Sequence, residues 1–389
     1  MASINIFENS TPIIEGSEAE ASTHLSAFIC GYSLYYKMTE RDTTQLGYKI
    51  FNTKDELISV FDISVLSGVS SGLPTGAGFS GGTIHDRELH SAINYLLYGG
   101  ILVAATGASA LNNTNLSIDS VFCEDNTKFQ DVITLVNLRQ DCVGILGSSA
   151  EYHNGTSASY TTATLAPYSV YGITGITGNT GNDENFFSIL GRKTVNRFYG
   201  TTGSINLLLT SDVAGLMASV DSAFGPWNPP SGIRKGEVQR FTNYEPKLSE
   251  TNIDTLNDSY GINSLSGIYG YPDRVFVMGD STLEKVDPDR MHIGIARLIL
   301  HIKRGIKPLL QGVLFEVNNN NTRTALANSV TSFLERIRNR GGISTYTVTC
   351  NETNNTETII TSKQLVIDIT FVPYYTIETV TFRFVLSQA

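Results

Sequence analysis

The stretch from Asp289 to Asn318, which reads DRMHIGIARLILHIKRGIKPLLQGVLFEVN, constrains the fold of this chain more than any other. Asp287 or Asp289 can cap a helix here, and Pro288 suits the first helical turn. Apolar residues then follow at helical spacing, at Met291, Ile295, Leu298 and Ile302. The pattern predicts an amphipathic helix, followed by a short strand that ends at residues 315–318.

Positive charge gathers on a neighbouring stripe of the same helix. Its members are Arg290, Arg297, His301 and Arg304. No acidic residue occurs between Met291 and Phe315, although the whole chain carries a net charge of −10. Such a stripe is usually a solvated face. The alternatives are a docking surface for an acidic partner and a set of internal ion pairs.

Length and composition bound the remaining classes of protein. A chain of 389 residues is expected to form two or three domains. The chain has 37 acidic and 27 basic residues, and this acidic balance argues against a nucleic-acid binder. We expect no signal peptide and no membrane span, because no apolar run approaches about 20 residues. The four scattered cysteines lack metal-site spacing, which predicts buried free thiols.

Two motifs are compatible with a serine hydrolase. Ser80 lies in a G-x-S-x-G match, but loop-forming residues precede it where a nucleophile elbow needs a strand. Gly279-Asp280-Ser281 and Asp289-x-x-His292 match the two signatures of Gly-Asp-Ser hydrolases, which normally lie far apart in sequence. We therefore predict no enzyme activity, no catalytic residue, no cofactor and no metal site.

Helical and strand patterns alternate along the chain, which predicts a mixed α+β and α/β fold. The helices are expected at 53–61, 85–98, 131–138, 211–224 and 324–340. The strands are expected at 28–31, 101–105, 141–146, 165–171, 186–190, 205–209, 344–350, 356–361 and 364–371.

Both ends of the chain read as extended arms. Near the N-terminus, Ile4 and Ile6 alternate with polar residues. Over residues 377–386 the apolar members Val380, Phe382, Phe384 and Leu386 alternate with polar ones. A short strand without a local partner has unpaired backbone groups and is suited to pairing with another chain. We predict that these six residues mark inter-subunit strands.

Several segments resemble the phage contractile tail sheath family, which also occurs in related contractile injection machines. The resemblance rests on Arg297-Leu298 with Phe315-Glu316-Val317-Asn318, Leu96 to Gly100, Ser211 to Gly215 with Asp221 and Trp227, Ile262-Asn263 with Val275 to Leu283, and Val372-Pro373 with Glu378. Here Val317 replaces the proline of the family's Phe-Glu-Pro-Asn, and the family's tryptophan and arginine are missing between Val275 and Leu283.

The resemblance implies a multi-domain sheath subunit with strand-forming arms. The expected division is an arm at 1–20, an N-terminal and middle α/β domain at 21–250 with a Gly/Thr/Asn-rich section at 147–204, a C-terminal sheath domain at 251–375 and a terminal strand at 376–389. The implied function is to polymerise around an inner tube and contract, driving the tube through a target envelope. The alternatives are another self-assembling surface or filament protein and a serine hydrolase.

The resemblance also implies partners and a location. The partners are further copies of the chain, the inner tail tube protein, and baseplate and terminator proteins, without nucleic acid or membrane insertion. The location is the virion tail, after assembly in the host cytoplasm. Because positive charge is concentrated in one helix of an acidic chain, the predicted tube-facing residues are Arg297, His301, Arg304 and Lys307.

Overall fold

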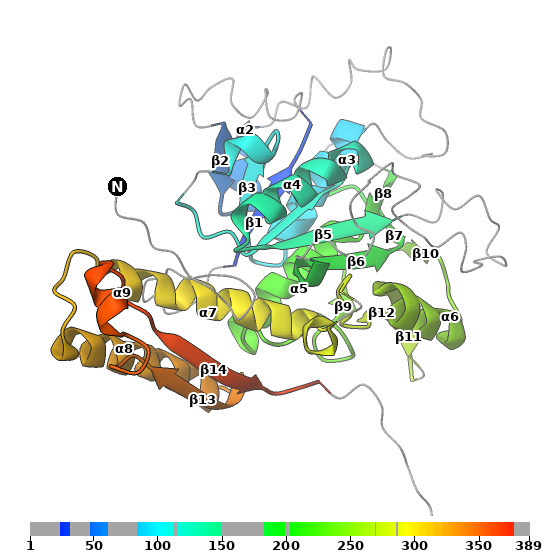
Figure 1. The fold of residues 1–389 in the computed structure, drawn as a ribbon. Helices are drawn as coiled ribbons and strands as arrows, with labels where there is room; N and C mark the ends of the chain where they lie inside the picture. The colour runs from blue at the N-terminus through cyan, green and yellow to red at the C-terminus, as the bar shows by residue number, and fades with distance from the viewer. Residues whose placement is uncertain are drawn as a thin grey trace, which may run out of the picture. The chain divides into compact units, whose positions relative to one another are not determined.

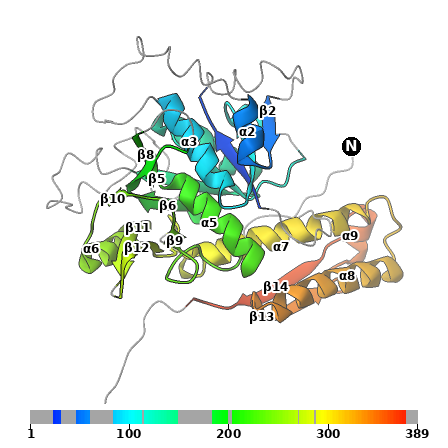
Figure 2. The ribbon, with the colours of Figure 1, turned by 180° about the vertical axis from the view of Figure 1, so that it is seen from behind.

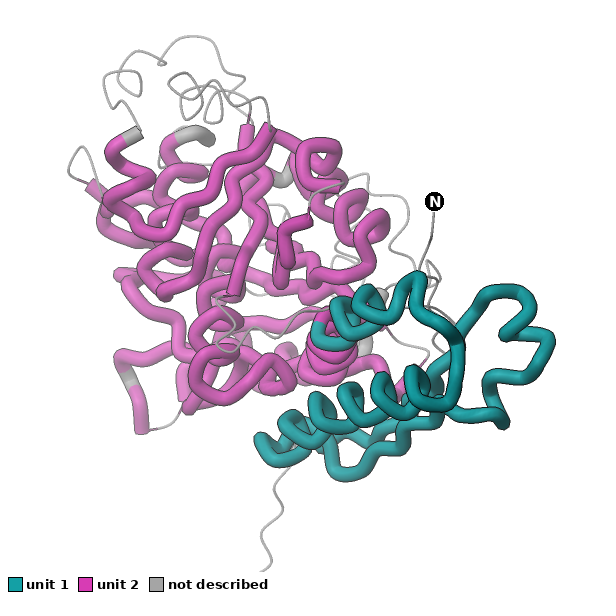
Figure 3. The backbone as a smooth tube through the Cα atoms, turned by 90° about the vertical axis from the view of Figure 1, so that its left-hand side faces the viewer, with its two compact units in different colours: residues 1–17, 305–389 teal, residues 18–304 magenta. Residues whose placement is uncertain are grey.

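The computed structural model describes residues 24–31, 47–60, 84–112, 115–148, 183–198, 203–268, 270–284 and 287–376. The chain divides into two compact units, which are coloured separately in Figure 3. Unit 2 comprises residues 18–304, and unit 1 comprises residues 1–17 and 305–389. The helix predicted from the basic stretch is α7 (Ile293–Gln311), and the division falls inside it, whereas the sequence suggested a division after residue 250.

Unit 2 is built on a nine-stranded mixed sheet, seen in Figure 1. In spatial order its strands are β2 (Tyr48–Phe51), β3 (Ile101–Ala105), β1 (Leu25–Ile29), β4 (Ser120–Cys123), β5 (Val143–Ser148), β6 (Phe186–Leu190), β11 (Ile262–Ile268), β12 (Tyr271–Met278) and β9 (Glu237–Val238). The strands from β3 to β11 run parallel, and β2, β12 and β9 add antiparallel edges.

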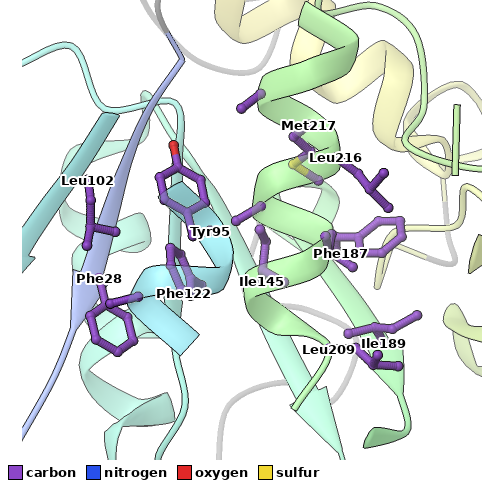
Figure 4. Packing of buried hydrophobic residues seen from close by; sticks show 14 of the residues in the cluster. Phe28, Tyr95, Leu102, Phe122, Ile145, Phe187, Ile189, Leu209, Leu216 and Met217 are labelled. Atoms are coloured by element: carbon purple, nitrogen blue, oxygen red, sulfur yellow. The ribbon is translucent and has the colours of Figure 1, made fainter. Parts of the chain in front are cut away.

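The parallel strands are apolar on both faces because helices cover both. Phe28 of β1 packs in a cluster with residues of α3 (Ile84–Leu96) and α5 (Thr210–Ala223), while Ala27 and Ile29 pack with α4 (Phe129–Arg139). Figure 2 shows α3 and α5 on the same face of the sheet. Figure 4 shows Tyr95 and Met217 from these helices close to the labelled side chains of the sheet. Unit 2 is therefore a three-layer α/β/α structure.

Smaller elements complete unit 2. A three-stranded sheet has the order β10 (Asn243–Glu245), β7 (Arg192–Asn196) and β8 (Ser204–Leu208). The short helix α2 (Lys54–Val60) begins after Thr53, whose Oγ1 accepts a hydrogen bond from the Glu56 N–H at 3.2 Å. Helix α6 (Glu250–Thr255) continues into a π-helical turn over Leu256–Tyr260.

Unit 1 contains the end of α7, helix α8 (Asn320–Asn339), the two-stranded sheet of β13 (Ile343–Thr349) and β14 (Asp368–Pro373), and the short helix α9 (Glu357–Thr361). Its buried apolar residues include Ile306, Leu326, Val330, Leu334, Ile337 and Ile343. Gly305 is required where α7 meets α8, because a Cβ at this position would lie 1.9 Å from the ring of Phe333.

Most predicted elements are confirmed, and two predictions are wrong. Residues 357–361 form a helix rather than a strand; Thr356 at the N-cap position makes no side-chain cap hydrogen bond, and the acidic Glu357 in the first turn favours the helix. Residues 312–318 form turns and irregular backbone rather than a strand. Phe315 there has a positive φ of 68°, which is incompatible with a strand. The pieces expected at 165–171 and 377–386 and the arm at 1–20 lie outside the described residues.

Two further sequence predictions concern residues inside the units. All four cysteines are buried and free, as expected, and burial raises the pKa of the Cys30, Cys123 and Cys142 thiols. In the part of the chain that the structure describes, no helix is both long and apolar enough to cross a membrane.

Candidate functional site

A buried ion pair ties helix α7 to α5 within unit 2. Arg297 is 4% exposed, Asp221 is 3% exposed, and the guanidinium donates a hydrogen bond to Asp221 Oδ1. The same guanidinium donates to the carbonyl oxygen of Asn228 at 3.0 Å. A buried charge without a partner is costly, so each residue is stabilised by the other. This burial favours the internal ion-pair interpretation of Arg297 over a solvated face.

The second carboxylate oxygen of Asp221 contacts a histidine next to β1. His24 Nδ1 lies 2.7 Å from Asp221 Oδ2, and His24 Nε2 lies 3.0 Å from Ser120 Oγ in β4. Burial alone would raise the pKa of Asp221, but the charge of Arg297 and the contact with His24 outweigh it and lower the pKa to about 2. The Asp221 carboxylate is therefore ionised throughout the neutral range.

Arg304, seven residues later on α7, makes a second connection to the sheet. Its Nη1 lies 2.7 Å from Asp119 Oδ1 and donates to the carbonyl oxygen of Ile118 at 2.9 Å. Asp119 Oδ2 in turn accepts a hydrogen bond from the Leu25 N–H at 2.9 Å. These contacts attach α7 to the segment that enters β4 and to the first residue of β1. We call His24, Asp119, Asp221, Arg297 and Arg304 the α7 cluster.

The donor atoms of the α7 cluster also resemble a metal site. His24, Asp119 and Asp221 offer ligand atoms that all lie within 4.8 Å of one another. Both carboxylates, however, are already paired with guanidinium groups of α7. A divalent cation would have to displace these arginines and leave their charges uncompensated. The arrangement therefore suits structural ion pairing better than metal binding.

The remaining two predicted tube-facing residues differ from the arginines. The ring of His301 meets Trp227 edge-on, with the ring centroids 6.0 Å apart. Lys307 is exposed and lies in the part of α7 that belongs to unit 1. The structure thus brings Arg297, His301 and Arg304 into contacts within unit 2. A contact with a tube stays a prediction for the four residues.

A second buried ion pair joins β7 to α3 and α5. Lys193 Nζ lies 2.7 Å from Asp212 Oδ1, and neither side chain is exposed. Lys193 also donates to Asn94 Oδ1 and to the carbonyl oxygen of Gln239, both at 3.0 Å, and the Tyr98 hydroxyl donates to Asp212 Oδ1 at 2.8 Å. Burial lowers the pKa of Lys193 against the opposing effect of Asp212. The network fixes the small sheet against the helical layer.

Glu124, which follows β4, is a buried carboxyl group without a cationic hydrogen-bond partner among the described residues. It is 1% exposed, Oε1 accepts a hydrogen bond from the Leu208 N–H at 3.0 Å, and Oε2 accepts none. Burial raises its pKa to about 8, although the charge of Arg87 opposes the rise. The carboxyl group therefore stays protonated at neutral pH.

We expect the variant Glu124→Gln to be more stable than the parent chain at alkaline pH. Because the folded-state pKa of about 8 exceeds the ordinary value of 4.5, the stability linked to this proton is present below pH 4.5 and lost as pH rises to about 8. Glutamine keeps the shape and cannot ionise. Urea unfolding at several pH values should show an advantage that grows by a few kcal/mol over this window. The exposed control Glu352→Gln should show no such advantage. If the stability of the Glu124→Gln and Glu352→Gln variants depended on pH in the same way, the raised pKa of Glu124 would be refuted.

The residues that suggested a Gly-Asp-Ser hydrolase lie in an irregular segment and make structural contacts. Asp280 Oδ1 lies 3.0 Å from His292 Nδ1, and the backbones of Ser281 and His292 form an isolated antiparallel bridge. The backbone N–H and carbonyl of Ser281 bind the Asn263 side chain, at 3.0 and 2.8 Å. Asp289, which the hydrolase signature would pair with the histidine, is exposed. Ser80 lies outside the described residues.

The sheet of unit 1 has open edges in the part of the chain that is described. Strands β13 and β14 pair antiparallel from Thr349 with Asp368 to Ile343 with Pro373, and each has only the other as a partner there. Val372, Tyr374 and Tyr375 are exposed at the end of β14. The predicted inter-subunit residues Ile4, Ile6, Val380, Phe382, Phe384 and Leu386 all lie outside the described residues.

Comparisons of sequence identify relatives of this chain. Residues 285–387 match the family described as the phage tail sheath C-terminal domain. The tail sheath protein of Vibrio phage KVP40 is 30% identical over 181 residues, which are 46% of this chain and 26% of the relative. That of Enterobacteria phage T4 is 25% identical over 264 residues, which are 67% of this chain and 39% of the relative. The chain thus spans well under half the length of these curated relatives.

Comparisons of structure extend the similarity of fold to nearly the whole chain. A chain of the anti-feeding prophage baseplate is matched with a TM-score of 0.68 and 16% identity, over 100% of this chain and 99% of that one. A chain of the PVC sheath complex, from an extracellular contractile injection system in its contracted state, is matched with a TM-score of 0.68 and 15% identity, over 99% and 96%. The C-terminal family match and the two relatives confirm the resemblance read from the sequence: the chain is similar to phage tail sheath proteins, and its residues 285–387 match the tail sheath C-terminal domain.

Proposed function

We propose that this chain is the structural subunit of a contractile sheath, which polymerises around an inner tube and contracts to drive the tube through a target envelope. The observation that carries the proposal is the family match over residues 285–387, a segment that includes the open-edged sheet of unit 1. An open sheet edge is a template for pairing with another chain. In this proposal the protein acts by assembly and not as an enzyme.

The joints between subunits are strands added to the sheet of β13 and β14. The C-terminal arm, with Val380, Phe382, Phe384 and Leu386, and the N-terminal arm, with Ile4 and Ile6, are the donated strands. A strand making about six hydrogen bonds contributes on the order of 3–9 kcal/mol per joint. Because the bonds are between backbones, a joint can persist while the subunits it links change their orientation.

The buried ion pairs support a rigid-body motion of unit 2 during contraction. The α7 cluster fixes α7 to the sheet, and Lys193 with Asp212 fixes the small sheet to the helices. Removing one partner of a fully buried pair, such as Arg297 with Asp221 or Lys193 with Asp212, costs about 3–5 kcal/mol, so these contacts persist while weaker surface contacts rearrange. Contraction is then release from a kinetically trapped extended assembly, which needs no nucleotide.

The partners follow from the same proposal. They are further copies of this chain, the inner tube protein, and the baseplate and terminator proteins of a virion tail or related injection machine. Among the four predicted tube-facing residues, exposed Lys307 is the most accessible and Arg297 the least. Nucleic acid and membrane insertion have no part in the proposal.

Electron microscopy of the purified chain tests the proposal directly. A sheath subunit should form long hollow cylinders as its concentration rises, with a diameter wide enough to enclose a tube. Solid fibres or flat arrays would instead indicate another self-assembling filament or surface protein. A dispersed monomer at every concentration, together with labelling of Ser80 or Ser281 by an active-site serine probe, would refute the structural role.

A further inference from the structure

Helix α6 and the π-helical turn after it expose a row of carboxylates. Glu250, Asp254 and Asp258 follow one another at intervals of four residues, and all three are exposed. Residues four apart on a helix lie on one face with their Cβ atoms about 5–6 Å apart. The opposite side is apolar, because Ile253 and Leu256 are buried. We call Glu250, Asp254 and Asp258 the acidic row.

No ion pair among the described residues of unit 2 accounts for this charge. None of the three carboxylates of the acidic row has an ion-pair partner among the described residues. By contrast, the exposed Glu245 nearby pairs with Arg192 at 2.8 Å. In a chain of net charge −10, a further cluster of like charges favours a monomer unless a cationic surface covers it.

The last turns of helix α8 in unit 1 expose charge of the opposite sign. Arg336 and Arg340 are four residues apart on one face, and both are exposed. Arg338 is also exposed and lies 2.6 Å from Glu335 through its Nη2. The buried residues of the same helix, including Leu334 and Ile337, are on its other side. Arg338 follows the buried Leu334 by four residues and so lies on a different face from Arg336 and Arg340. We call Arg336 and Arg340 the basic row.

We propose that the basic row of one copy docks on the acidic row of a second copy of this chain. Both rows are exposed, they carry opposite charge, and they have the same four-residue spacing on a helix, so guanidinium and carboxylate groups can pair in register. Every copy carries both rows, and the contact therefore repeats through an assembly. The inference rests on the proposed self-assembly and adds an electrostatic contact to the strand joints.

Arginines at a helix C-terminus also stabilise the helix itself, so the test must separate folding from docking. The first variant is Arg336→Glu with Arg340→Glu, and the second is Asp254→Lys with Asp258→Lys. A matched control, Lys54→Glu with Arg234→Glu, reverses two exposed charges elsewhere. Thermal melting of dilute protein reports folding, and light scattering against concentration gives the critical concentration for assembly.

Each reversal should raise the critical concentration about tenfold or more at low salt, because two or more pairs become repulsive. The effect should shrink near 1 M salt, where screening acts over about 3 Å. The control should assemble like the parent chain. Melting temperatures of the dilute variants should stay close to that of the parent.

Mixing decides whether the contact joins two copies. When the two reversal variants are mixed in equal amounts, every contact in an alternating copolymer pairs opposite charges, so assembly should recover. A contact within one chain would be restored only when both reversals are combined in the same chain. Recovery only in that combined variant, or reversals that assemble like the parent, would overturn the inference while leaving the proposed function intact. A parent chain that never assembles would overturn both.

Discussion

Deleting residues 376–389 should leave a soluble, cooperatively folded chain that no longer polymerises. Among the described residues of unit 1, the buried apolar side chains lie in α7, α8 and β13 and at Cys350, all of which precede the deletion. The lost strand would otherwise contribute about 3–9 kcal/mol per joint, so even the lower value raises the critical concentration more than about 100-fold. Light scattering with thermal melting measures both consequences, and deletion of residues 2–20 should behave in the same way.

Point variants sharpen this prediction. Phe382→Asp with Phe384→Asp places charge on the apolar side of the alternating strand and should abolish assembly. The matched control Thr381→Asp places charge on the polar side and should assemble far better. Insoluble protein after truncation would mean that residues 376–389 complete the core of their own domain. Long cylinders built by either truncated chain would exclude that arm as an inter-subunit joint.

Replacing Arg297 by Met should destabilise unit 2 by about 3–5 kcal/mol, because the buried Asp221 carboxylate loses its cationic partner. Arg304→Met is a matched control on the same helix. The pair of Arg304 with Asp119 is partly exposed, with side chains 17% and 14% exposed, so its loss should destabilise unit 2 less than the loss of Arg297 does. Urea unfolding of the monomer measures both. If both variants lost the same small amount of unfolding free energy, the α7 cluster would not be what holds helix α7 in unit 2.

The double variant Arg297→Met with Asp221→Asn isolates the pair. It should recover much of the stability lost in Arg297→Met, since the buried charge that had lost its partner is removed. The pH dependence has a definite sign. Because the folded-state pKa of Asp221 is lowered to about 2, its contribution is full above the ordinary value of 3.8 and is lost as pH falls toward 2. The advantage of the parent over the double variant should therefore disappear in strong acid.

Local pattern in the sequence was sufficient for most elements of the fold. Strands 101–105 and 186–190 were predicted with their observed bounds, because a short apolar run between turn residues allows few alternatives. The helix of the basic stretch was predicted from its apolar stripe, and the sheath family from motifs spread over the chain. These features depend on residues that are close in sequence, or on their order along the chain.

Local pattern was misleading where two tendencies compete. The β-branched residues at 358–361 favour a strand, whereas the acidic Glu357 in the first turn favours the observed helix α9. The apolar run before Asn318 suggested a strand, but the helix end, Gly312 and the positive φ of Phe315 produce turns. The short strand β4 was missed, although it lies in the middle of the sheet.

The meaning of the basic stripe was decided only by the tertiary structure. The sequence determined that α7 is amphipathic, that its arginines share a face and that the chain resembles tail sheath proteins. It could not pair Arg297 with Asp221, which is 76 residues away, because no local pattern encodes which distant carboxylate a helix meets. The order of the nine strands brings β1, β4 and α5 together, and a charge buried there requires a partner. Packing therefore made Arg297 an internal contact, where composition alone suggested a surface.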